Sequence, residues 1–583
     1  MFHGPDTSGW IQQFYTGNLM PEKITLAIAV MAAALSAEAA KQKDITLDLL
    51  GTYETGVFDD GAAEIVSYDP VTQRVFVINA AGSTVDLLDI SDPTSPTLSS
   101  SIDVAPDIAT TFPGSESGGI NSVAVKNSIV AVAVENDDKQ ALGWAAFYDV
   151  YGSFLGAVEA GALPDMITFT PNGHYALVAN EGEPSDDYKI DPEGSVTVID
   201  LRGGVDNATV RTAGFGDFSL ADAQAAGVRV PRASEMDSVT SVEEDLEPEY
   251  IATSHDSRTA WVALQENNAV AEIDISSATV TQLVGLGSKD HSLPGNELDA
   301  SNDDGVINIA SWPVSGLFMP DSIVAYRTRG KTYLVTANEG DGREYISDDA
   351  AYSTEELCLD AGGLEFSVDG DEFECLFYTD EDRVKDADLN EDAFPDAADL
   401  QQKANLGRLK IAATEGLNGD GEYEQLYSFG ARSITVWDAE TFDSYDTGSI
   451  IEKVTADVYP NDFNSTNDEN GTFDERSDDK GPEPETAVIG KAFGRQYAFV
   501  GLERIGGIMV FDVTQPEKEI RYVSYVNNRD FSVDDVESSE VGDLGPEGLF
   551  FIKEEDSPIG EPLLVVGNEV SGTTSIYQVE RVD

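Results

Sequence analysis

The sequence is poor in histidine, cysteine and basic residues. Its 583 residues include 4 His and 2 Cys, and 34 Lys and Arg stand against 108 Asp and Glu, for a formal net charge of -74. None of the four histidines, His3, His174, His255 and His291, has the spacing of metal ligands, which argues against a zinc site built from histidine. Because the acidic excess repels polyanions, nucleic acid and anionic membranes are not expected as partners.

Several catalytic signatures are also missing. The chain has no Gly-x-Ser-x-Gly nucleophile elbow, no glycine-rich phosphate-binding loop and no dinucleotide-binding fingerprint. A hydrolase built from this chain would therefore have to use metal ions held by carboxylates, with arginines that grip a phosphate group.

The composition is nevertheless that of a folded protein. Hydrophobic residues make up 41% of the chain, which is enough for a packed core. Because the acidic residues are spread along the whole chain, we expect an acidic surface rather than a disordered acidic tail. Two interpretations of the charge stay open: solubility in a salty habitat, where salt screens self-repulsion, and affinity for divalent cations.

No apolar run reaches the length of a transmembrane helix. The apolar run at residues 24–35 is followed by small residues at 37–39, which is the pattern of a secretory signal peptide with its cleavage site. We therefore expect a signal peptide at residues 20–39, translation that starts at Met20 rather than within 1–19, and no membrane insertion after cleavage. The expected location is secreted, periplasmic or at the cell surface.

The two cysteines fit an oxidising compartment. Cys358 and Cys375 flank a glycine-rich acidic loop, and export would favour a disulfide between them. The alternative is a pair of free thiols. A bridge that closes a loop of this size could stabilise the protein by about 3 kcal/mol at most.

The chain is rich in one repeated pattern. Six apolar runs end in a carboxylate, usually beside Asn, and a seventh run at residues 78–80 has only the Asn. Upstream of each run lies a short polar-x-apolar-x-apolar segment. The carboxylates of the upstream position are Glu64, Asp165, Glu249, Asp321, Glu485 and Glu547, and those at the ends of the runs are Glu135, Glu181, Glu266, Glu339, Glu503 and Glu569. Repeats of this kind decide the fold before any other signal.

One copy of the repeat indicates its structure. Residues 166–169 and 175–179 are predicted strands joined by a turn at 171–173, and 195–200 is a third strand with nearly alternating polarity. Seven such units predict an all-β fold, a seven-bladed β-propeller with long loop insertions. The last copy lacks a fourth strand of its own. Residues 45–53 could supply it, which would close the ring and remove an exposed sheet edge.

The predicted domain organisation is a single propeller over residues 45–583. It is interrupted by insertions at about 203–247, 340–407 and 461–481. The first insertion contains a predicted helix at 220–226. Insertions of this length are uncommon unless they carry a function or are disordered.

Several blocks of the chain resemble a known family. They are Ala179-Asn180-Glu181-Gly182-Glu183-Pro184, Ala337-Asn338-Glu339-Gly340-Asp341-Gly342-Arg343-Glu344-Tyr345, Phe429-Gly430-Ala431-Arg432-Ser433, Lys480-Gly481-Pro482-Glu483-Pro484-Glu485, Leu502-Glu503-Arg504 and Gly542-Asp543-Leu544-Gly545-Pro546-Glu547-Gly548-Leu549. These blocks resemble the choice-of-anchor I domain, a family of bacterial extracellular proteins related to the mesenchyme-specific cell surface glycoprotein of biomineralising animals.

The resemblance runs from about residue 47 to residue 579. It implies an exported propeller that is often tethered at its C-terminus, although this sequence ends at Asp583 without an LPXTG-like motif or a hydrophobic tail. Some relatives carry the label alkaline phosphatase. A label of this kind does not assign an activity to this chain.

The repeat also predicts where its carboxylates lie. The first two strands of a blade run antiparallel, so the start of one and the end of the next lie at the same edge. Both sets would then line one mouth of the central channel, where like charges raise one another's pKa or demand cations. Carboxylates, Asn and backbone carbonyls are ligands that Ca²⁺ prefers. We therefore predict a Ca²⁺ site drawn from Glu181, Glu339, Asp341, Glu485, Glu503, Glu547 and Glu569.

Two alternatives to this site stay open. The Asn-Glu-Gly segments could be turns whose side chains cap backbone donors of a neighbouring blade. Alternatively, Arg343, Arg432 and Arg504 lie near the same edges, and with metal-bound carboxylates they would suit a metal-dependent phosphoesterase of the alkaline phosphatase or phytase type, acting on phosphorylated small molecules.

The leading expectation is a Ca²⁺-stabilised extracellular or cell-surface protein that binds partners or serves as a scaffold. Its expected partners are divalent cations and surface polymers. Geometry discriminates between the two functions, because phosphate binding needs the three arginines to converge on one cavity, whereas a scaffold lets them pair separately.

Overall fold

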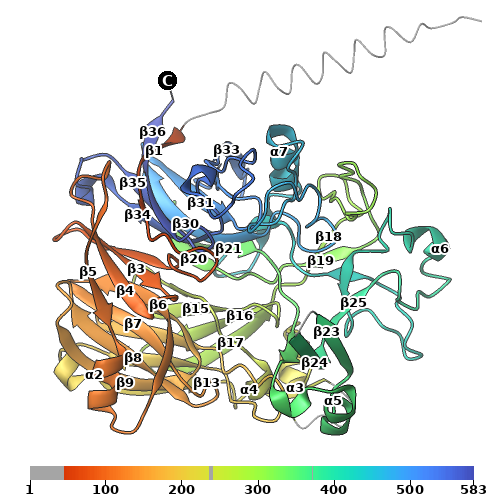
Figure 1. Cartoon of the computed structure of the whole chain (residues 1–583), viewed down its shortest axis with the longest axis horizontal. Helices are drawn as coiled ribbons and strands as arrows, with labels where there is room; N and C mark the ends of the chain where they lie inside the picture. Colours follow the sequence, from red (N-terminus) through yellow and green to blue (C-terminus); the bar gives the residue numbers. More distant parts are fainter. Residues whose placement is uncertain (1–44, 235–239, 370–371, 583) are drawn as a thin grey trace, which may run out of the picture. The chain divides into compact units, whose positions relative to one another are not determined.

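Sheets of four antiparallel strands recur along the chain, and seven of them are present (Figure 1). The structure, a computed structural model, describes residues 45–234, 240–369 and 372–582. The predicted signal peptide and the proposed start at Met20 lie outside these ranges. The predicted all-β class is confirmed.

Each sheet takes its strands in sequence order, apart from the last sheet, which also includes β1; in the fifth sheet a long insertion separates β21 from β28. The sheets are β2 (Val66–Asp69), β3 (Arg74–Asn79), β4 (Thr84–Asp89) and β5 (Thr97–Asp103); β6 (Ser117–Lys126), β7 (Ile129–Asn136), β8 (Leu142–Asp149) and β9 (Phe154–Ala162); β10 (Pro164–Phe169), β11 (Tyr175–Asn180), β12 (Ser195–Asp200) and β13 (Thr209–Gly214); β14 (Ile251–Thr253), β15 (Thr259–Leu264), β16 (Ala269–Asp274) and β17 (Thr279–Gly285); β20 (Ile323–Thr328), β21 (Lys331–Asn338), β28 (Ser433–Asp438) and β29 (Ser444–Asp446); β30 (Pro484–Ala492), β31 (Arg495–Leu502), β32 (Ile508–Asp512) and β33 (Arg521–Val526); and β34 (Pro546–Ile552), β35 (Leu563–Asn568), β36 (Thr573–Arg581) and β1 (Ile45–Glu54).

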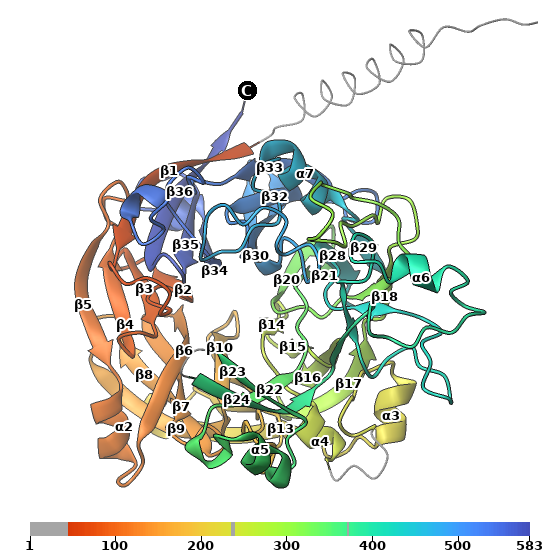
Figure 2. The ribbon, with the colours of Figure 1, turned by 45° about the vertical axis from the view of Figure 1, so that its right-hand side comes forward.

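The innermost strands of the seven sheets lie around a common axis (Figure 2). Successive innermost strands contact one another from β2 through β6, β10, β14, β20 and β30 to β34, and β34 contacts β2. The hydrophobic core is divided in the same way, with one buried cluster between each neighbouring pair of sheets. Because the sheets are buried on both faces, strands such as β11 and β35 are apolar almost throughout rather than alternating. This is the arrangement of a β-propeller.

The first strand of the described chain completes the last sheet. β1 lies antiparallel to β36, with Ile45 opposite Arg581. The hydroxyl groups of Thr52 and Ser575 hydrogen-bond at 2.8 Å. Ile45 and Leu47 are buried in the cluster between this sheet and the preceding one. The edge of β36 is therefore covered.

Loop length differs between the two edges of the sheets. The turns between the first and second strands are mostly short, as at residues 329–330 and 493–494. The longest connections all lie at the opposite edge, where the innermost strands begin. They are residues 181–194, 215–250, 286–322, 339–432, 447–483 and 527–545.

The insertions differ in extent from the prediction. The sequence pattern predicts an excursion over 203–247, but β13 inside it pairs with β12 as the fourth strand of its sheet, so the excursion starts after Gly214. Most side chains of β13 are exposed, and its sequence has no clear apolar alternation. The insertion predicted at 340–407 continues to β28, because the short strands within it belong to other sheets.

The connections at the edge with long loops carry small sheets and most of the helices. The small sheets are β18 (Ser288–Asp290), β19 (Ser315–Leu317) and β27 (Tyr427–Ser428); β22 (Glu344–Ser347), β24 (Glu372–Thr379) and β23 (Glu365–Asp369); and β25 (Glu381–Arg383) with β26 (Lys410–Ala412). The helices of the described ranges are α2 (Ala105–Thr111), α3 (Leu220–Ala225), α4 (Val242–Asp245), α5 (Glu355–Ala361), α6 (Ala397–Leu400) and α7 (Ile450–Val458), with short 3₁₀ turns η1 (Val205–Asn207), η2 (Ala350–Tyr352), η3 (Ser539–Val541) and η4 (Glu554–Asp556). In the part of the chain that the structure describes, no helix has the length and apolar character needed to cross a membrane.

The predicted disulfide is confirmed. Cys358 on α5 and Cys375 on β24 form it, and both are fully buried. Gly363 packs against the bridge so closely that a Cβ atom there would lie 2.4 and 2.5 Å from the two sulfur atoms. The bridge therefore holds the helix and the hairpin of this insertion together.

Replacing both cysteines by serine is expected to loosen this insertion and to leave the seven large sheets intact. The closed loop spans 17 residues in sequence, so the loss is at most about 3 kcal/mol. Limited proteolysis would show faster cleavage within the insertion, with the main thermal transition unchanged. Equal cleavage rates for the variant and the parent protein would mean that packing alone holds the insertion.

Candidate functional site

A cavity of about 280 Å³ is lined by the starts of the innermost strands of all seven sheets. It therefore lies on the axis of the ring, at the edge with the long loops. Four carboxylates of the upstream repeat position line it: Glu64, Asp165, Asp321 and Glu547. In two other sheets the residue after the upstream carboxylate lines the cavity. These residues are Tyr250, which follows Glu249, and Thr486, which follows Glu485.

A repeated backbone turn brings the two acidic positions together. Leu163, Met319 and Glu483 have positive φ angles of 44°, 38° and 47°, and each precedes the proline before a channel carboxylate. Non-glycine residues rarely adopt this conformation, and a following proline restricts them further. Such strain persists only where the surrounding structure enforces it.

In the turns at Leu163 and Glu483 the carbonyl group accepts a hydrogen bond from the second acidic position, whereas the Met319 carbonyl accepts from the N–H of Gly340, the residue after Glu339, at 3.0 Å. The backbone N–H of Glu181 donates to the Leu163 carbonyl at 2.9 Å, and that of Glu503 donates to the Glu483 carbonyl at 2.9 Å. The N–H of Glu569 donates to the Gly545 carbonyl at 2.8 Å in the last sheet. Each turn therefore fixes one carboxylate of each set at the same edge.

The Asn residues of the repeat are structural. The buried Asn180 donates to the hydroxyl of Thr197 at 2.9 Å and accepts from the Gly161 N–H at 2.9 Å. Asn338 likewise donates to the Thr435 hydroxyl at 2.8 Å. In Asn-Glu-Gly the Asn therefore ties strands together. Asn180 caps a backbone donor of the neighbouring sheet, as the turn alternative expected, whereas Asn338 bonds within its own sheet.

One member of the second set departs from the predicted channel position. Glu135 accepts a hydrogen bond from the backbone N–H of Gly119 at 2.6 Å. It caps its own sheet, because the two glycines at the start of β6 leave the backbone N–H accessible to this side chain. Glu135 thus caps a backbone donor, as the capping alternative expected, but the donor belongs to its own sheet and not to a neighbouring blade.

Among the residues that the structure describes, two groups of three carboxylates have oxygen atoms within 4.8 Å of one another. The first consists of Asp321, Glu339 and Glu485, and the second of Glu339, Glu483 and Glu503. We call them the open triad and the neutralised triad, because their surroundings differ in charge.

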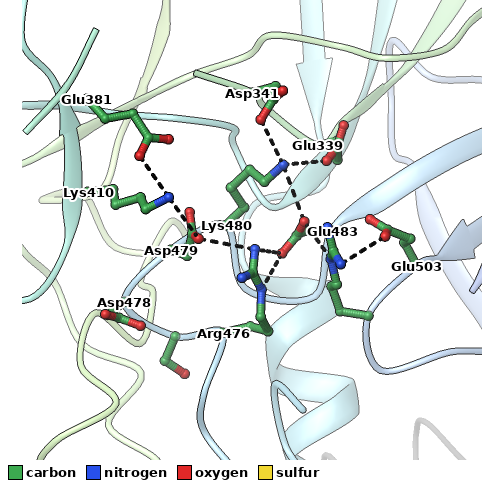
Figure 3. Close-up of polar contacts among 12 residues, drawn as sticks. Glu339, Asp341, Glu381, Lys410, Arg476, Asp478, Asp479, Lys480, Glu483 and Glu503 are labelled. Atoms are coloured by element: carbon green, nitrogen blue, oxygen red, sulfur yellow. Dashed lines mark hydrogen bonds and ion pairs between the residues drawn. The ribbon is translucent and has the colours of Figure 1, made fainter. Parts of the chain in front are cut away.

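The neutralised triad is surrounded by basic side chains (Figure 3). The Lys480 ammonium lies 2.6 Å from Glu339 and 3.4 Å from Glu483. Arg476 contacts the other oxygen of Glu483 at 2.7 Å. Burial alone would raise the pKa of Glu483, but Lys480, Arg504 and Arg476 outweigh burial and lower it to about 2. The carboxylate of Glu483 therefore stays ionised without a metal, whereas burial raises the pKa of Glu339 and, with the charge of Glu483, raises the pKa of Glu503 to about 8.

The other channel carboxylates face negative neighbours. Burial, and then the charges of Glu569 and Asp165, raise the pKa of Glu64 to about 8. For Glu485, burial and the charges of Glu339, Asp321, Glu503 and Glu547 all raise the pKa well above its usual range. Similar causes raise the pKa values of Asp165, Glu181, Glu249, Asp321 and Glu547.

The three candidate arginines do not converge on one cavity. The fully buried Arg343 pairs with Asp245 and, at 2.7 Å, with Glu247. Arg432 pairs with Glu452 at 2.6 Å and donates to backbone carbonyls of the 447–483 connection.

Of the three arginines, Arg504 lies beside the triads. Its guanidinium contacts Glu483 at 3.0 Å and Glu503 at 3.2 Å.

The predicted metal ligands fall into three situations. Glu339, Glu485 and Glu503 belong to the triads. Three more, Glu181, Glu547 and Glu569, lie among other channel carboxylates. Besides burial, the charges of neighbouring carboxylates raise the pKa of Glu181 and of Glu547, and the charge of Glu569 raises the pKa of Glu64. Asp341 is half exposed and contacts Lys480 at 3.2 Å.

Sequence reasoning missed Lys480 and Glu483 as site residues. Both belong to a block that carries the family resemblance, but their partner Glu339 lies 141 positions before Lys480. The alternating Pro-Glu-Pro-Glu sequence at 482–485 was the available signal, since it doubles the acidic position of the repeat.

Comparison with known proteins identifies distant relatives. Gigasin-3a of Magallana gigas is 33% identical over 193 residues, which cover 32% of this chain and 68% of that protein. The mesenchyme-specific cell surface glycoprotein of Strongylocentrotus purpuratus is 28% identical over 289 residues, 46% of this chain and 35% of that protein. The match with the sea urchin protein therefore spans about a third of its length.

Similar solved structures have TM-scores below 0.5. They include Kuenenia stuttgartiensis hydrazine synthase, with a TM-score of 0.41 and 12% identity over 91% of this chain and 99% of that chain. Streptogramin B lyase has a TM-score of 0.38 and 9% identity over 92% and 98%. At these scores the likeness says nothing about activity.

The profile of the choice-of-anchor I domain matches residues 64–516, more than half of the chain. The match contains both triads and the confirmed disulfide. The chain therefore belongs to the choice-of-anchor I domain family.

Proposed function

We propose that the protein is an exported or cell-surface scaffold, a seven-bladed β-propeller closed by β1 and stabilised by Ca²⁺ in its channel. Its family, and its similarity to a cell surface glycoprotein of Strongylocentrotus purpuratus, support the location. The seven four-stranded sheets and the pairing of β1 with β36 support the blade count and the closure.

The negative charge of the channel is the observation that supports a bound cation. Carboxylates from several sheets meet in a buried space, and burial and their mutual repulsion raise their pKa values. Either protons or metal ions must compensate this charge near neutral pH. Hard divalent cations with oxygen ligands, Ca²⁺ above all, fit this donor set.

Partner binding is assigned to the edge with the long loops. These loops surround the mouth at which the carboxylates gather, and loops on a rigid scaffold commonly carry binding residues. Bound Ca²⁺ would let this acidic surface contact anionic polymers that it otherwise repels.

The separate ion pairs of the arginines favour this role over a phosphoesterase. Arg343 and Arg432 are each occupied by a buried carboxylate of their own. A phosphate group in the channel would have to displace one of these carboxylates, which would leave a buried charge unpaired.

Removal of Ca²⁺ is expected to lower the melting temperature, and by more at pH 8 than at pH 5. The folded-state pKa of Glu64 is about 8 and that of Asp165 about 7, both above their ordinary values of 4.5 and 3.8. Between the ordinary and the raised pKa the folded state binds more protons than the unfolded state, so stability falls as the pH rises. Ca²⁺ replaces the protons that are lost.

Differential scanning fluorimetry with EDTA and with added CaCl₂, at both pH values, measures this effect. MgCl₂ serves as the control, because Mg²⁺ demands a smaller octahedral site. Identical melting temperatures with and without EDTA at pH 8 would remove the cation from the proposed function.

A further inference from the structure

The open triad has the dimensions of a site for one cation. The carboxylate oxygens of Asp321, Glu339 and Glu485 all lie within 4.8 Å of one another. Ca²⁺ binds oxygen at about 2.3–2.6 Å, so a single ion can bridge oxygens with this separation. The three carboxylates can supply up to about six oxygens, and channel water can complete the coordination.

One carboxylate of the open triad has an unpartnered buried oxygen. Glu485 is 9% exposed, and its Oε2 atom is buried without a hydrogen-bond partner. Leaving a buried carboxylate oxygen unpaired is costly, and each such atom in a native structure calls for a water or an ion. This observation is independent of the clustering of acidic residues.

The backbone holds the open triad in place. Ser322 donates to the Glu485 carbonyl at 3.0 Å and accepts from the Ala487 N–H at 3.1 Å. This fully buried hydroxyl joins the start of β20 to β30 and so keeps Asp321 beside Glu485. The Gln265 side chain donates to Glu339 Oε2 at 2.8 Å, which orients the third carboxylate. Such outer contacts preorganise metal ligands.

The neutralised triad needs no metal, because basic side chains already compensate it. Lys480 contacts Glu339 and Glu483, and Arg476 contacts Glu483 (Figure 3). Arg504 contacts both Glu483 and Glu503. Its three carboxylates thus meet three cationic side chains. In the open triad, Lys480 contacts Glu339, and the charges that act most strongly on Glu485 are negative.

We propose that the channel binds one Ca²⁺ ion at Asp321, Glu339 and Glu485, and that Lys480 occupies the adjacent triad as a built-in cation that prevents a second ion from binding there. This assignment rests on the proposed Ca²⁺-stabilised channel and specifies its site. The two triads share Glu339, so the ion and the ammonium group would contact the same carboxylate.

The proposal is tested by isothermal titration of CaCl₂ into the full-length mature protein after EDTA treatment at pH 7.5. Glu485→Gln is expected to weaken Ca²⁺ binding at least about tenfold, since it removes one of three charged ligands. Glu555→Gln, the same change on an exposed carboxylate outside the channel, is expected to leave the dissociation constant within about threefold. Lys480→Met is expected to add a second binding event.

The outcomes of this experiment distinguish a failure of the proposed site from a failure of the proposed function. If the parent protein binds no Ca²⁺, both the site and the Ca²⁺-stabilised function fail. If it binds Ca²⁺ and Glu485→Gln binds equally well, the ion lies elsewhere in the channel and only this assignment fails. Circular dichroism confirms folding, and if Glu485→Gln does not fold, Asp321→Asn replaces it with the same expected loss.

Discussion

Deletion of β1 is expected to abolish cooperative unfolding. The deletion removes Ile45 and Leu47 from the core and exposes the edge of β36 along the whole strand. Loss of each buried aliphatic side chain costs about 2–5 kcal/mol, and the open edge can pair with other chains. Thermal denaturation and size-exclusion chromatography would show a broad transition and aggregates.

Point variants in β1 separate lost packing from lost strand pairing. Leu47→Ala is expected to lower the free energy of unfolding by about 2–5 kcal/mol. Leu49→Ala, on a side chain that is 40% exposed in the same strand, is expected to have a small effect. A truncated protein that melts like the parent would show that β1 is dispensable and that closure by this strand is wrong.

Replacement of Arg343 by leucine is expected to be among the most destabilising single changes in the chain. The side chain is 1% exposed, and it pairs with Asp245 and Glu247, which are equally buried. Removal of one partner from a buried ion pair costs about 3–5 kcal/mol, because the remaining charges have no water to solvate them. Urea denaturation measures the loss.

The effect of Arg343→Leu should grow with pH. Burial raises the pKa of Glu247 and Arg343 opposes this, so without the arginine the carboxyl group would keep its proton to a higher pH in the folded state. Stability then falls as the pH rises above the ordinary pKa of 4.5. The triple variant with Asp245→Asn and Glu247→Gln should recover part of the loss, whereas Arg202→Leu, on an exposed pair with Asp200, should have no measurable effect. Equal stability of Arg343→Leu and the parent protein would contradict this account.

Sequence periodicity was sufficient to predict the sheets because each repeat encodes its own strands and turns. It failed at β13, whose exposed side chains carry no apolar pattern, and the predicted excursion at 203–247 was therefore too long. The partner of β1 could be inferred only by elimination, since no local feature of residues 45–53 indicates β36.

The candidate site was predictable where the repeat alone determines position. Glu339, Glu485 and Glu503 were expected at the channel mouth, and the backbone turns at Leu163 and Glu483 explain why the two acidic positions meet. The sequence did not predict which of these carboxylates have their charge compensated by basic side chains. That depends on contacts between irregular loops, which no repeat or spacing encodes.

The contacts of Arg343 and Lys480 illustrate this limit. Arg343 was a candidate phosphate ligand in the phosphoesterase alternative, but the excursion after β13 supplies Asp245 and Glu247, which pair with it. Lys480 lies at the end of a connection rich in Asp, Asn and Gly, for which the sequence predicted an insertion and no basic site residue. In both cases the partner comes from a different loop, far away in sequence.

The pairing of β1 with β36 also constrains the order of folding. Thr52 and Ser575, which hydrogen-bond across this pair, are 523 positions apart in the sequence. Contacts between such distant residues form slowly, because the chain between them must first become ordered. β1 therefore has to stay unpaired until the final strand has been synthesised, and during that interval its free edge is open to other chains. A chain that stalls or is cleaved before β36 would retain its first strand without a partner, however well the intervening sheets had folded.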